Sequence, residues 1–249
     1  MKYIYFIALL PFIFGSACKK NKVKDTLSDG LIAYYPLNGT VLDSSGNSLH
    51  GINEFVSFVV DRLGKTSGAG DFNGKTSSMV VKNASALNLS NDFTIATWFK
   101  ADTIYEIPGT VKMILSKNRN GNATTGFAFG LWNNSVSNVT QGIVNFSAAP
   151  NFTTITYPTA NTGLVQVNRW YHSVCTYEKA SGKFVYYING SMVDQKSLVF
   201  SNVANDFDFL IGAEAIGVST KTNYFNGALD EIRIYNRVLT NAEITKLSK

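Results

Sequence analysis

Short apolar runs, separated by clusters of Gly, Asn, Ser and Asp, recur along most of the chain. The runs are rich in Val, Ile, Thr, Tyr and Phe, which is typical of β-strands bounded by turns. The pattern predicts strands over these ranges: Met79–Val81, Phe93–Phe99, Val111–Ser116, Gly126–Trp132, Ile143–Ala148, Trp170–Tyr177, Phe184–Ile188, Phe207–Ile211 and Leu229–Tyr235.

Two turn sequences indicate how some strands connect. Asn189-Gly190 stands between two strand-like runs and predicts a tight hairpin, because a type I′ turn needs positive φ at both central residues. Ser181-Gly182 predicts a second hairpin in the same way. Only one helix is expected: Thr240 to Glu243 form a capping box, and Ile244 and Leu247 then share one helical face.

Many short strands with a single helix predict an all-β fold, namely a two-sheet antiparallel jelly-roll sandwich with a short C-terminal helix. The sequence shows no linker and no internal repeat after Gly30. Residues 30–249 are therefore expected to form one domain.

The first 17 residues differ from the rest. Lys2 precedes an apolar stretch that is too short to span a bilayer, which indicates a secretory signal peptide over residues 1–17. The four residues that end at Cys18 resemble a bacterial lipoprotein box, which implies an acylated Cys18; an ordinary signal peptide with a chance cysteine is the alternative. Lysine-rich residues 18–29 predict a flexible tether. The expected location is the cell envelope, as an outer-membrane lipoprotein. The sequence does not decide whether it faces the periplasm or the cell surface.

The charge is modest, with 22 Lys and Arg against 17 Asp and Glu and a net charge of +5. No basic stripe with interleaved aromatic residues stands out, so nucleic acid is not an expected partner. If Cys18 is acylated, Cys175 is the other cysteine of the chain. It lies in an apolar strand and predicts a buried thiol, so no disulfide is expected.

Six motifs stand in a recognisable order, at Tyr35–Gly51, Asp71–Gly74, Phe93–Trp98, Trp170–His172, Tyr187–Gly190 and Phe225–Arg237. In this order they resemble LamG-like, concanavalin A-like jelly-roll domains of the kind found in Bacteroidetes-type surface lipoproteins. The resemblance spans Leu31 to Leu247 and implies the concanavalin A-like fold. It does not choose a function, because this fold carries lectins, adhesion modules, hydrolases and structural domains.

A carboxylate near each end of the domain suggests a metal site. Strand alternation places Asp230 on the apolar face of Ile232, where a carboxylate needs a partner. Asp43 lies in a Gly- and Asn-rich loop, and if the two ends meet, these carboxylates and oxygens near Asn47 and His50 have the composition of a calcium site. The resemblance also implies a structural calcium there. The alternative is that Asp43 forms an Asx-turn and Asp230 accepts backbone N–H groups.

Catalytic arrangements are not evident. Laminarinase-type relatives on this fold carry an E-x-D-x-x-E strand motif, which is not found; Asp206 and Asp208 lack a third acid at the right spacing. Asp230 and Glu231 are adjacent and are expected on opposite faces of a strand, whereas a retaining pair needs carboxyl groups about 5–5.5 Å apart. His172 alternates with apolar neighbours and predicts a core histidine.

One strand carries a candidate binding platform. In Gly126–Trp132, alternation puts the large apolar residues on one face and Trp132 on the other, beside Ala128 and Gly130. Small residues beside a Trp favour a shallow platform for a sugar ring, and the alternative is a Trp packed under a loop. The candidate ligand-binding residues are Trp132, Asn133, Arg119 and Tyr224.

The expected function is that of a membrane-anchored, non-catalytic, lectin-like module that binds a glycan or a protein, with calcium as a structural cofactor. One alternative is a glycan-degrading hydrolase with an unrecognised site. Another is an adhesion or envelope component with a protein partner, which predicts an exposed apolar patch.

Overall fold

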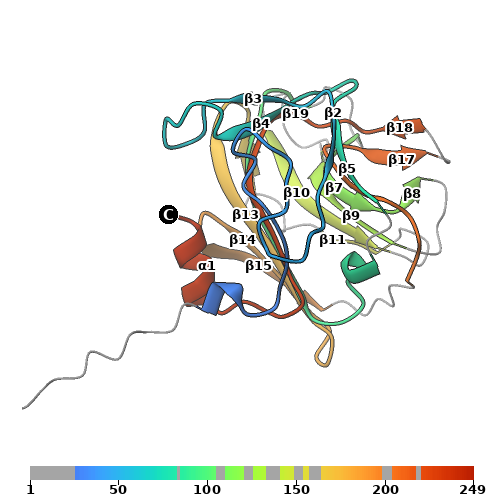
Figure 1. Cartoon of the computed structure of the whole chain (residues 1–249). Coiled ribbons are helices and arrows are strands. Elements are labelled where there is room, and N and C mark those ends of the chain that lie inside the picture. Colours follow the sequence, from blue (N-terminus) through green and yellow to red (C-terminus); the bar gives the residue numbers. More distant parts are fainter. Residues whose placement is uncertain are drawn as a thin grey trace, which may run out of the picture.

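The computed structural model describes residues 26–82, 85–104, 110–120, 126–132, 141–148, 154–156, 164–197, 204–216 and 220–249. Within these ranges two large antiparallel sheets face each other and a small sheet lies at one end (Figure 1). The predicted all-β sandwich with a C-terminal helix is therefore confirmed. The signal peptide, Cys18 and residues 19–25 of the tether lie outside the described residues, and their roles stay predictions.

The first sheet has eight strands, and β1 pairs with β19 beside the main order. In spatial order the strands are β15 (Ser191–Ser197), β14 (Lys183–Ile188), β13 (Trp170–Glu178), β6 (Phe93–Ala101), β19 (Asn226–Tyr235), β4 (Ala69–Asn73) and β3 (Ser57–Val59), with β1 (Leu31–Tyr35) on β19.

The second sheet also has eight strands, and β12 pairs with β10 beside the main order. In spatial order they are β11 (Thr154–Thr156), β10 (Gln141–Ala148), β9 (Phe127–Trp132), β7 (Val111–Lys117), β16 (Phe209–Ile211), β5 (Ser78–Val81) and β2 (Ile52–Glu54), with β12 (Leu164–Gln166) on β10.

The remaining elements are short. They are β18 (Thr220–Thr222), β17 (Glu214–Ile216) and β8 (Arg119–Asn120) of the small sheet, the 3₁₀ helices η1 (Thr26–Ser28) and η2 (Ser85–Leu87), and α1 (Asn241–Leu247). The capping box at Thr240 and Glu243 is present as predicted. None of the helices in the described ranges is long and apolar enough to cross a membrane.

Both predicted hairpins are confirmed. Asn189 and Gly190 have φ angles of 51° and 78°, and they connect β14 to β15 through a two-residue turn. Gly182, with a φ of 65°, lies in the turn between β13 and β14. Turn residues that tolerate positive φ therefore set these two registers.

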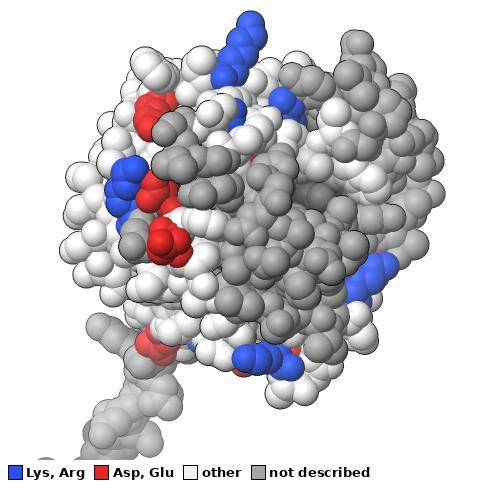
Figure 2. All heavy atoms as spheres, turned by 90° about the vertical axis from the view of Figure 1, so that its right-hand side faces the viewer, with Lys and Arg blue, Asp and Glu red and all other residues white. Residues whose placement is uncertain are grey.

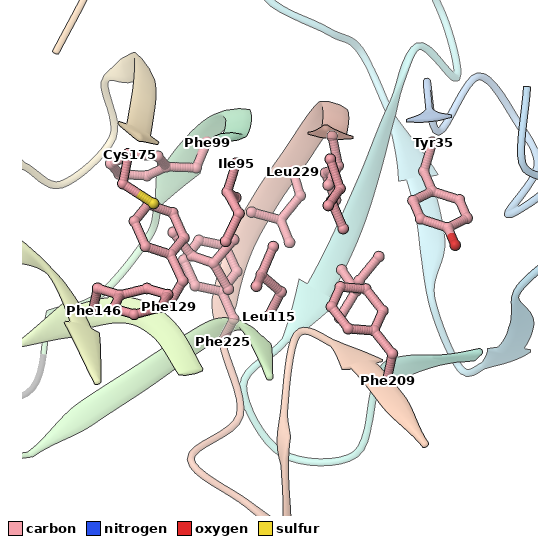
Figure 3. Packing of buried hydrophobic residues seen from close by; sticks show 14 of the residues in the cluster. Tyr35, Ile95, Phe99, Leu115, Phe129, Phe146, Cys175, Phe209, Phe225 and Leu229 are labelled. Carbon is pink, nitrogen blue, oxygen red and sulfur yellow. The ribbon is translucent and has the colours of Figure 1, made fainter. Parts of the chain in front are cut away.

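The core lies between the two large sheets and is rich in aromatic side chains (Figure 3). Phe184 of β14 and Phe146 of β10 join the two sheets, with ring centroids 4.9 Å apart. The Cys175 sulfur points into this cluster and the residue is fully buried, as predicted. Such inward-facing rings bury large apolar areas and hold the two sheets together.

The two ends of the domain lie side by side. Strand β1 pairs with β19, with Leu31 opposite Tyr235 and Tyr35 opposite Ile232. Helix α1 packs on the outer face of the first sheet through Ile244, and η1 lies beside it (Figure 1). The condition that the two ends meet is therefore fulfilled, and the domain is closed by its own first and last described elements.

A β-bulge in β19 changes one predicted orientation. The register with β6 shifts between Asp230 and Arg233, and Glu231 adopts a φ of 55°. Ile232 points into the core, whereas Asp230 lies opposite Trp98 and follows the inward-facing Leu229. The prediction that Asp230 shares the face of Ile232 was therefore wrong, because the bulge inserts a residue between them.

Candidate functional site

The Asp43 carboxylate is fully engaged by the loop that it organises. Its Oδ1 accepts hydrogen bonds from the backbone N–H groups of Tyr34 and Ser45, both at 2.9 Å. Its Oδ2 accepts from the Ser45 hydroxyl at 2.8 Å and from the Leu49 N–H at 3.0 Å. Burial opposes the ionised form, but these hydrogen bonds outweigh it and hold the pKa of Asp43 below its usual value. The arrangement is the predicted alternative, an Asx-turn, and not an open cation ligand.

Asn47 and His50 belong to the same loop. The Asn47 amide donates to the carbonyl oxygens of Leu31 and Ile32, at 3.0 Å and 2.8 Å. The His50 Nδ1 accepts the backbone N–H of Asp43 at 3.2 Å. Both side chains therefore tie the loop to β1 and to itself.

Asp230 is held elsewhere, by an arginine. The Arg62 Nη1 lies 2.7 Å from its Oδ2, and the guanidinium stacks 4.5 Å from the centre of the Trp98 ring. Burial raises the pKa of Asp230 to about 7, helped by the Glu231 charge, and Arg62 offsets part of this. Asp230, which was predicted to bind calcium, is thus paired with the guanidinium of Arg62.

These contacts do not fit the predicted calcium site. A carboxylate has about four lone-pair positions, and Asp43 already accepts four hydrogen bonds. In the described ranges, no three His, Cys, Asp or Glu residues gather in a way that could hold a metal ion. Calcium at Asp43, Asn47, His50 and Asp230 stays an untested prediction, and the site chemistry described below does not involve it.

The predicted platform on β9 is less open than its sequence suggests. Phe127, Phe129 and Leu131 point into the core as predicted. On the other face Ala128 is only 1% exposed, and a side chain at Gly130 would meet the carbonyl oxygen of Lys112. The small residues thus allow close approach of neighbouring backbone instead of forming a free surface.

Two of the predicted ligand residues flank the start of β7. Half-buried Trp132 lies opposite Val111 in the β7–β9 ladder, and Tyr224 bridges Met113 from the other side. The backbone of Arg119 is in β8 and pairs in parallel with β17. Asn133 lies outside the described residues.

A pocket of about 420 Å³ opens at this end of the sandwich. Its walls come from the turn after β4, the start of β7, and the segment from β18 to β19. The volume is within the range of about 300–1,000 Å³ typical of small-molecule sites. Among the residues that the structure describes, those that line it are Gly74, Lys75, Thr110, Val111, Lys112, Lys221, Thr222, Asn223 and Tyr224.

The Asn223–Tyr224 wall is fixed from behind by a buried carboxylate. Glu214 is 5% exposed, and its two oxygens accept hydrogen bonds from the amides of Asn118 and Asn223, at 2.6 Å and 2.7 Å. Burial raises the pKa of Glu214, and the two amides counteract this in part. The Asn223 carbonyl also accepts the Met113 N–H at 2.9 Å. The wall is therefore preorganised, because these hydrogen bonds hold Asn223 in one position.

The opposite wall is a tight turn organised by Asn73. Its Oδ1 accepts the backbone N–H groups of Lys75, Thr76 and Ser77, at 2.9 Å, 2.9 Å and 3.1 Å. Gly74 has a φ of 72°, which favours glycine. The turn thus places Lys75 at the pocket rim on a defined backbone.

Sequence reasoning missed most of this pocket. Lys75, Lys112 and Lys221 come from three distant segments, and no local pattern links them. Glu214 reads as an ordinary polar residue beside an apolar run, and only its buried position identifies it as a support. Tyr224 was predicted as a ligand residue and does line the pocket, but its role stays a prediction.

A family model described as the concanavalin A-like lectin/glucanases superfamily matches residues 73–245, which is more than half of the chain. The chain belongs to this superfamily. A comparison with curated proteins gives no match.

Solved structures with the same fold include carbohydrate-binding proteins. One is domain 4 of AbnA, in complex with arabinotriose; AbnA is an extracellular GH43 arabinanase from Geobacillus stearothermophilus. The match covers 88% of this chain and 98% of that domain, with a TM-score of 0.63 and 18% identity. The binding domain of Paraclostridial Mosquitocidal Protein 1 matches with a TM-score of 0.67 and 20% identity, over 89% of this chain and 52% of its own. At these identities the likeness shows the fold alone.

A structure of botulinum neurotoxin type C, whose cell entry depends on two ganglioside molecules, matches with a TM-score of 0.65 and 15% identity. The match covers 90% of this chain and 51% of the toxin chain. The chain therefore spans about half the length of these toxin structures, and nearly all of AbnA domain 4.

Proposed function

We propose that this protein is a non-catalytic, membrane-anchored module that binds a glycan in the pocket beside Tyr224. The observation that carries the proposal is the combination of an aromatic ring with hydroxyl groups in one preorganised hollow. The lining includes the aromatic residue Tyr224 and the hydroxyl-bearing residues Thr110 and Thr222. Sugars are bound by such combinations, because apolar ring faces stack and hydroxyl groups exchange hydrogen bonds.

The AbnA likeness supports this reading. That domain is almost completely covered by the match, belongs to an extracellular enzyme and has a structure in complex with arabinotriose. Its separate status as domain 4 of an arabinanase is consistent with a binding role apart from catalysis. A similar role is proposed for this chain.

A catalytic function has weaker support. The buried carboxylate nearest the pocket wall, Glu214, has both oxygens bound by amides of Asn118 and Asn223. A general acid or base must reach the substrate, whereas both oxygens of Glu214 are hydrogen-bonded to the protein. Glu214 therefore fits a structural role better than a catalytic one. Hydrolysis stays the alternative, and turnover of a polysaccharide would promote it.

Membrane attachment through an acylated Cys18 is part of the proposal and rests on the sequence of residues 1–18. It would place the domain in the cell envelope as an outer-membrane lipoprotein, held by buried acyl methylenes at about 0.8 kcal/mol each. Metabolic labelling with a fatty acid tests it: the label should be incorporated by the native chain and not by Cys18→Ser.

A protein partner is a second candidate, and a specific observation favours it. Phe55 is 80% exposed and Leu63 72% exposed, and both lie in turns around β3. Phe55 also has a φ of 60°, which is unusual for a bulky residue. Large exposed apolar side chains on one set of turns are typical of an interaction surface.

A binding experiment separates these functions. The purified full chain is titrated calorimetrically with arabinotriose and with a panel of oligosaccharides, and the strongest ligand is then measured against Tyr224→Ala. We expect binding to fall about tenfold or more, because stacking on an aromatic ring contributes about 1–2 kcal/mol. Trp170→Ala, at a half-buried aromatic residue on the first sheet, is the control and should bind normally. Absence of binding to every glycan would instead favour the protein partner.

A further inference from the structure

A second hollow, of about 300 Å³, lies on the outer face of the first sheet beside the start of α1. Its floor is formed by the paired strands β13 and β14, and its wall by residues 238–241, which connect β19 to α1. It shares no described lining residue with the pocket beside Tyr224. Helix α1 and strand β18, which mark the two sites, lie on opposite sides of the domain (Figure 1).

We propose that this hollow binds a small zwitterion with an aliphatic side chain, either a free amino acid or a short peptide with free ends. The site is additional to the proposed glycan site and does not depend on it. Such a ligand carries an ammonium group, a carboxylate group and an apolar side chain. The described lining has a counterpart for each of these groups, in the order Glu178, Lys183 and Val185.

The two charged residues form the rim of the hollow. Glu178 and Lys183 stand directly opposite each other in the β13–β14 ladder and are exposed, whereas the next pair on this face, Thr176 and Val185, is buried. Opposite residues of such a ladder have Cβ atoms about 4.5–5.5 Å apart, so both charges belong to one small opening. Among the described residues neither side chain forms an ion pair, and Glu178 uses one carboxylate oxygen to accept a hydrogen bond from the Ser181 hydroxyl. The other oxygen and the Lys183 ammonium can therefore contact a ligand.

Opposite charges at one rim select for a ligand that has both signs. The charges of Glu178 and Lys183 cancel, so a simple anion or cation meets one attractive and one repulsive group. A zwitterion can contact both groups favourably, and the attraction between two exposed side chains is too weak to prevent this. A sugar fits less well, because Tyr187, an aromatic residue of the lining, is 8% exposed and presents little of its ring for stacking.

The interior of the hollow suits the aliphatic part of the ligand. Val185 on the floor is 4% exposed and Leu239 on the wall is 2% exposed. An aliphatic side chain that enters beside them removes apolar surface from water, which favours binding. The charged groups of the ligand stay at the rim, so no charge has to be buried.

The wall of the hollow is held in place before any ligand binds. The Thr94 hydroxyl donates a hydrogen bond to the Arg237 carbonyl at 2.8 Å and accepts one from the Leu239 N–H at 3.0 Å. The Tyr187 hydroxyl donates to the Asn241 Oδ1 at 3.1 Å, which ties the wall to β14. A preformed site loses less conformational entropy when the ligand enters.

Charges elsewhere do not provide a comparable attraction. Figure 2 shows the side of the domain that lies on the right in Figure 1 and faces away from α1, and the charged side chains visible there among the described residues form small separate groups. Scattered charges exert little force on a ligand without net charge. Binding of a zwitterion therefore depends on the contacts within one hollow.

The test measures the binding of matched ligands to the purified full chain by calorimetry. Leucine and leucyl-leucine carry both charges, N-acetyl-leucine lacks the ammonium group, and leucinamide lacks the carboxylate. We expect a zwitterion to bind about tenfold more tightly than either capped derivative, because each derivative loses one charge-assisted hydrogen bond. The leucine and leucyl-leucine arms distinguish a free amino acid from a peptide.

Two substitutions assign each charge of the ligand to its partner. Glu178→Gln should weaken the better zwitterion about tenfold and should not weaken N-acetyl-leucine, which has no ammonium group. Lys183→Gln should weaken the same zwitterion by a similar factor and should not weaken leucinamide, which has no carboxylate. Lys65→Gln, at an exposed lysine in the loop between β3 and β4, is the control and should leave all affinities unchanged.

Three results would overturn the inference. The first is no heat of binding from leucine or leucyl-leucine at concentrations up to about 10 mM. The second is equal binding of all four ligands, because the two charges of the ligand would then not be recognised. The third is a zwitterion whose affinity neither substitution changes, since it would bind elsewhere. None of these results bears on glycan binding beside Tyr224, which is measured with oligosaccharides.

Discussion

Asp230 of β19 and Arg62 of the loop between β3 and β4 form a buried ion pair, with Nη1 and Oδ2 2.7 Å apart and side chains 14% and 2% exposed for Arg62 and Asp230. Trp98 completes the cluster, because the Arg62 guanidinium lies over its ring. The pair joins a loop near the start of the domain to its last strand. The Arg62 guanidinium thus lies beside Asp230, where the sequence analysis expected a calcium ion.

Replacement of Arg62 should show how much the ion pair with Asp230 contributes to the stability of the fold. In Arg62→Met the buried carboxylate loses its cation, and we expect a loss of about 3 kcal/mol in the free energy of unfolding at about pH 8. Because burial raises the pKa of Asp230 to about 7, above its unfolded value of about 3.9, its contribution to stability declines as pH rises from about 4 to about 7. The variant should therefore lose much less at about pH 5, where Asp230 is protonated. Urea unfolding at the two pH values measures both.

Asp230→Asn is the control for this prediction. With no titrating group at position 230, the added change Arg62→Met should cost the same at both pH values. An Arg62→Met variant that is equally destabilised at both pH values in the native Asp230 background would contradict the assignment.

The Asp43 loop provides a prediction about calcium. Since its four hydrogen bonds use the carboxylate completely, a chelator should leave the thermal midpoint of the native protein unchanged. Asp43→Ala should lower the free energy of unfolding by about 2 kcal/mol, because it leaves the partly buried N–H groups of Tyr34 and Leu49 without acceptors. Differential scanning calorimetry with EDTA and with added CaCl₂ tests both parts. A midpoint that falls with EDTA and recovers with calcium would revive the metal site.

The fold was predictable because its signals are local. The capping box at Thr240 and the turn at Asn189 each act within a few residues, and the alternation in Phe93–Ala101 needs only its own strand to be recognised. The face of Asp230 was not predictable in this way. In β19 the adjacent acids Asp230 and Glu231 separate Leu229 from Ile232, but this spacing alone does not identify a bulge. The bulge depends on Glu231 adopting a positive φ beside β6.

The pocket was largely beyond sequence reasoning for a different reason. Lys75, Lys112 and Lys221 are each unremarkable in their own segments, and their meeting depends on the pairing order of both sheets. The sequence also did not show whether Gly130 lies on an open surface or against another strand. In the structure the Lys112 backbone packs closely against it. A close contact between the backbones of two strands does not change the spacing of apolar residues along either strand, so the sequence pattern does not reveal it.

The joined ends of the domain give a further prediction. Glu243 accepts hydrogen bonds from Arg237 and from the Thr26 hydroxyl, and the Arg237 guanidinium in turn donates to the Thr26 carbonyl. The hydrogen bond from Arg237, opposed by burial and helped by Thr26 and Thr240, holds the pKa of Glu243 well below its usual value. Its contribution to stability is therefore present above the unfolded pKa of about 4.3 and is lost only in strong acid.

Glu243→Gln should loosen both ends together. We expect a loss of about 1–2 kcal/mol and faster hydrogen exchange in residues 26–35 as well as in α1, with β6 unchanged. Lys249→Gln, an exposed residue at the C-terminus, is the control. Faster exchange confined to α1 would show that Glu243 supports only its own helix.

The last prediction concerns Cys175, which is completely buried between the sheets. Burial raises the pKa of its thiol, so the reactive thiolate is suppressed and alkylation requires the fold to open. In a Cys18→Ser background, where Cys175 is the sole cysteine, maleimide labelling of the native protein should be on the order of a thousand-fold slower than in urea. Cys18→Ser with Thr66→Cys places a thiol in an exposed loop and should add one fast-labelling site. Native labelling of Cys175 at the rate of position 66 would mean that the core opens readily, which would contradict the packing of the sandwich around this residue.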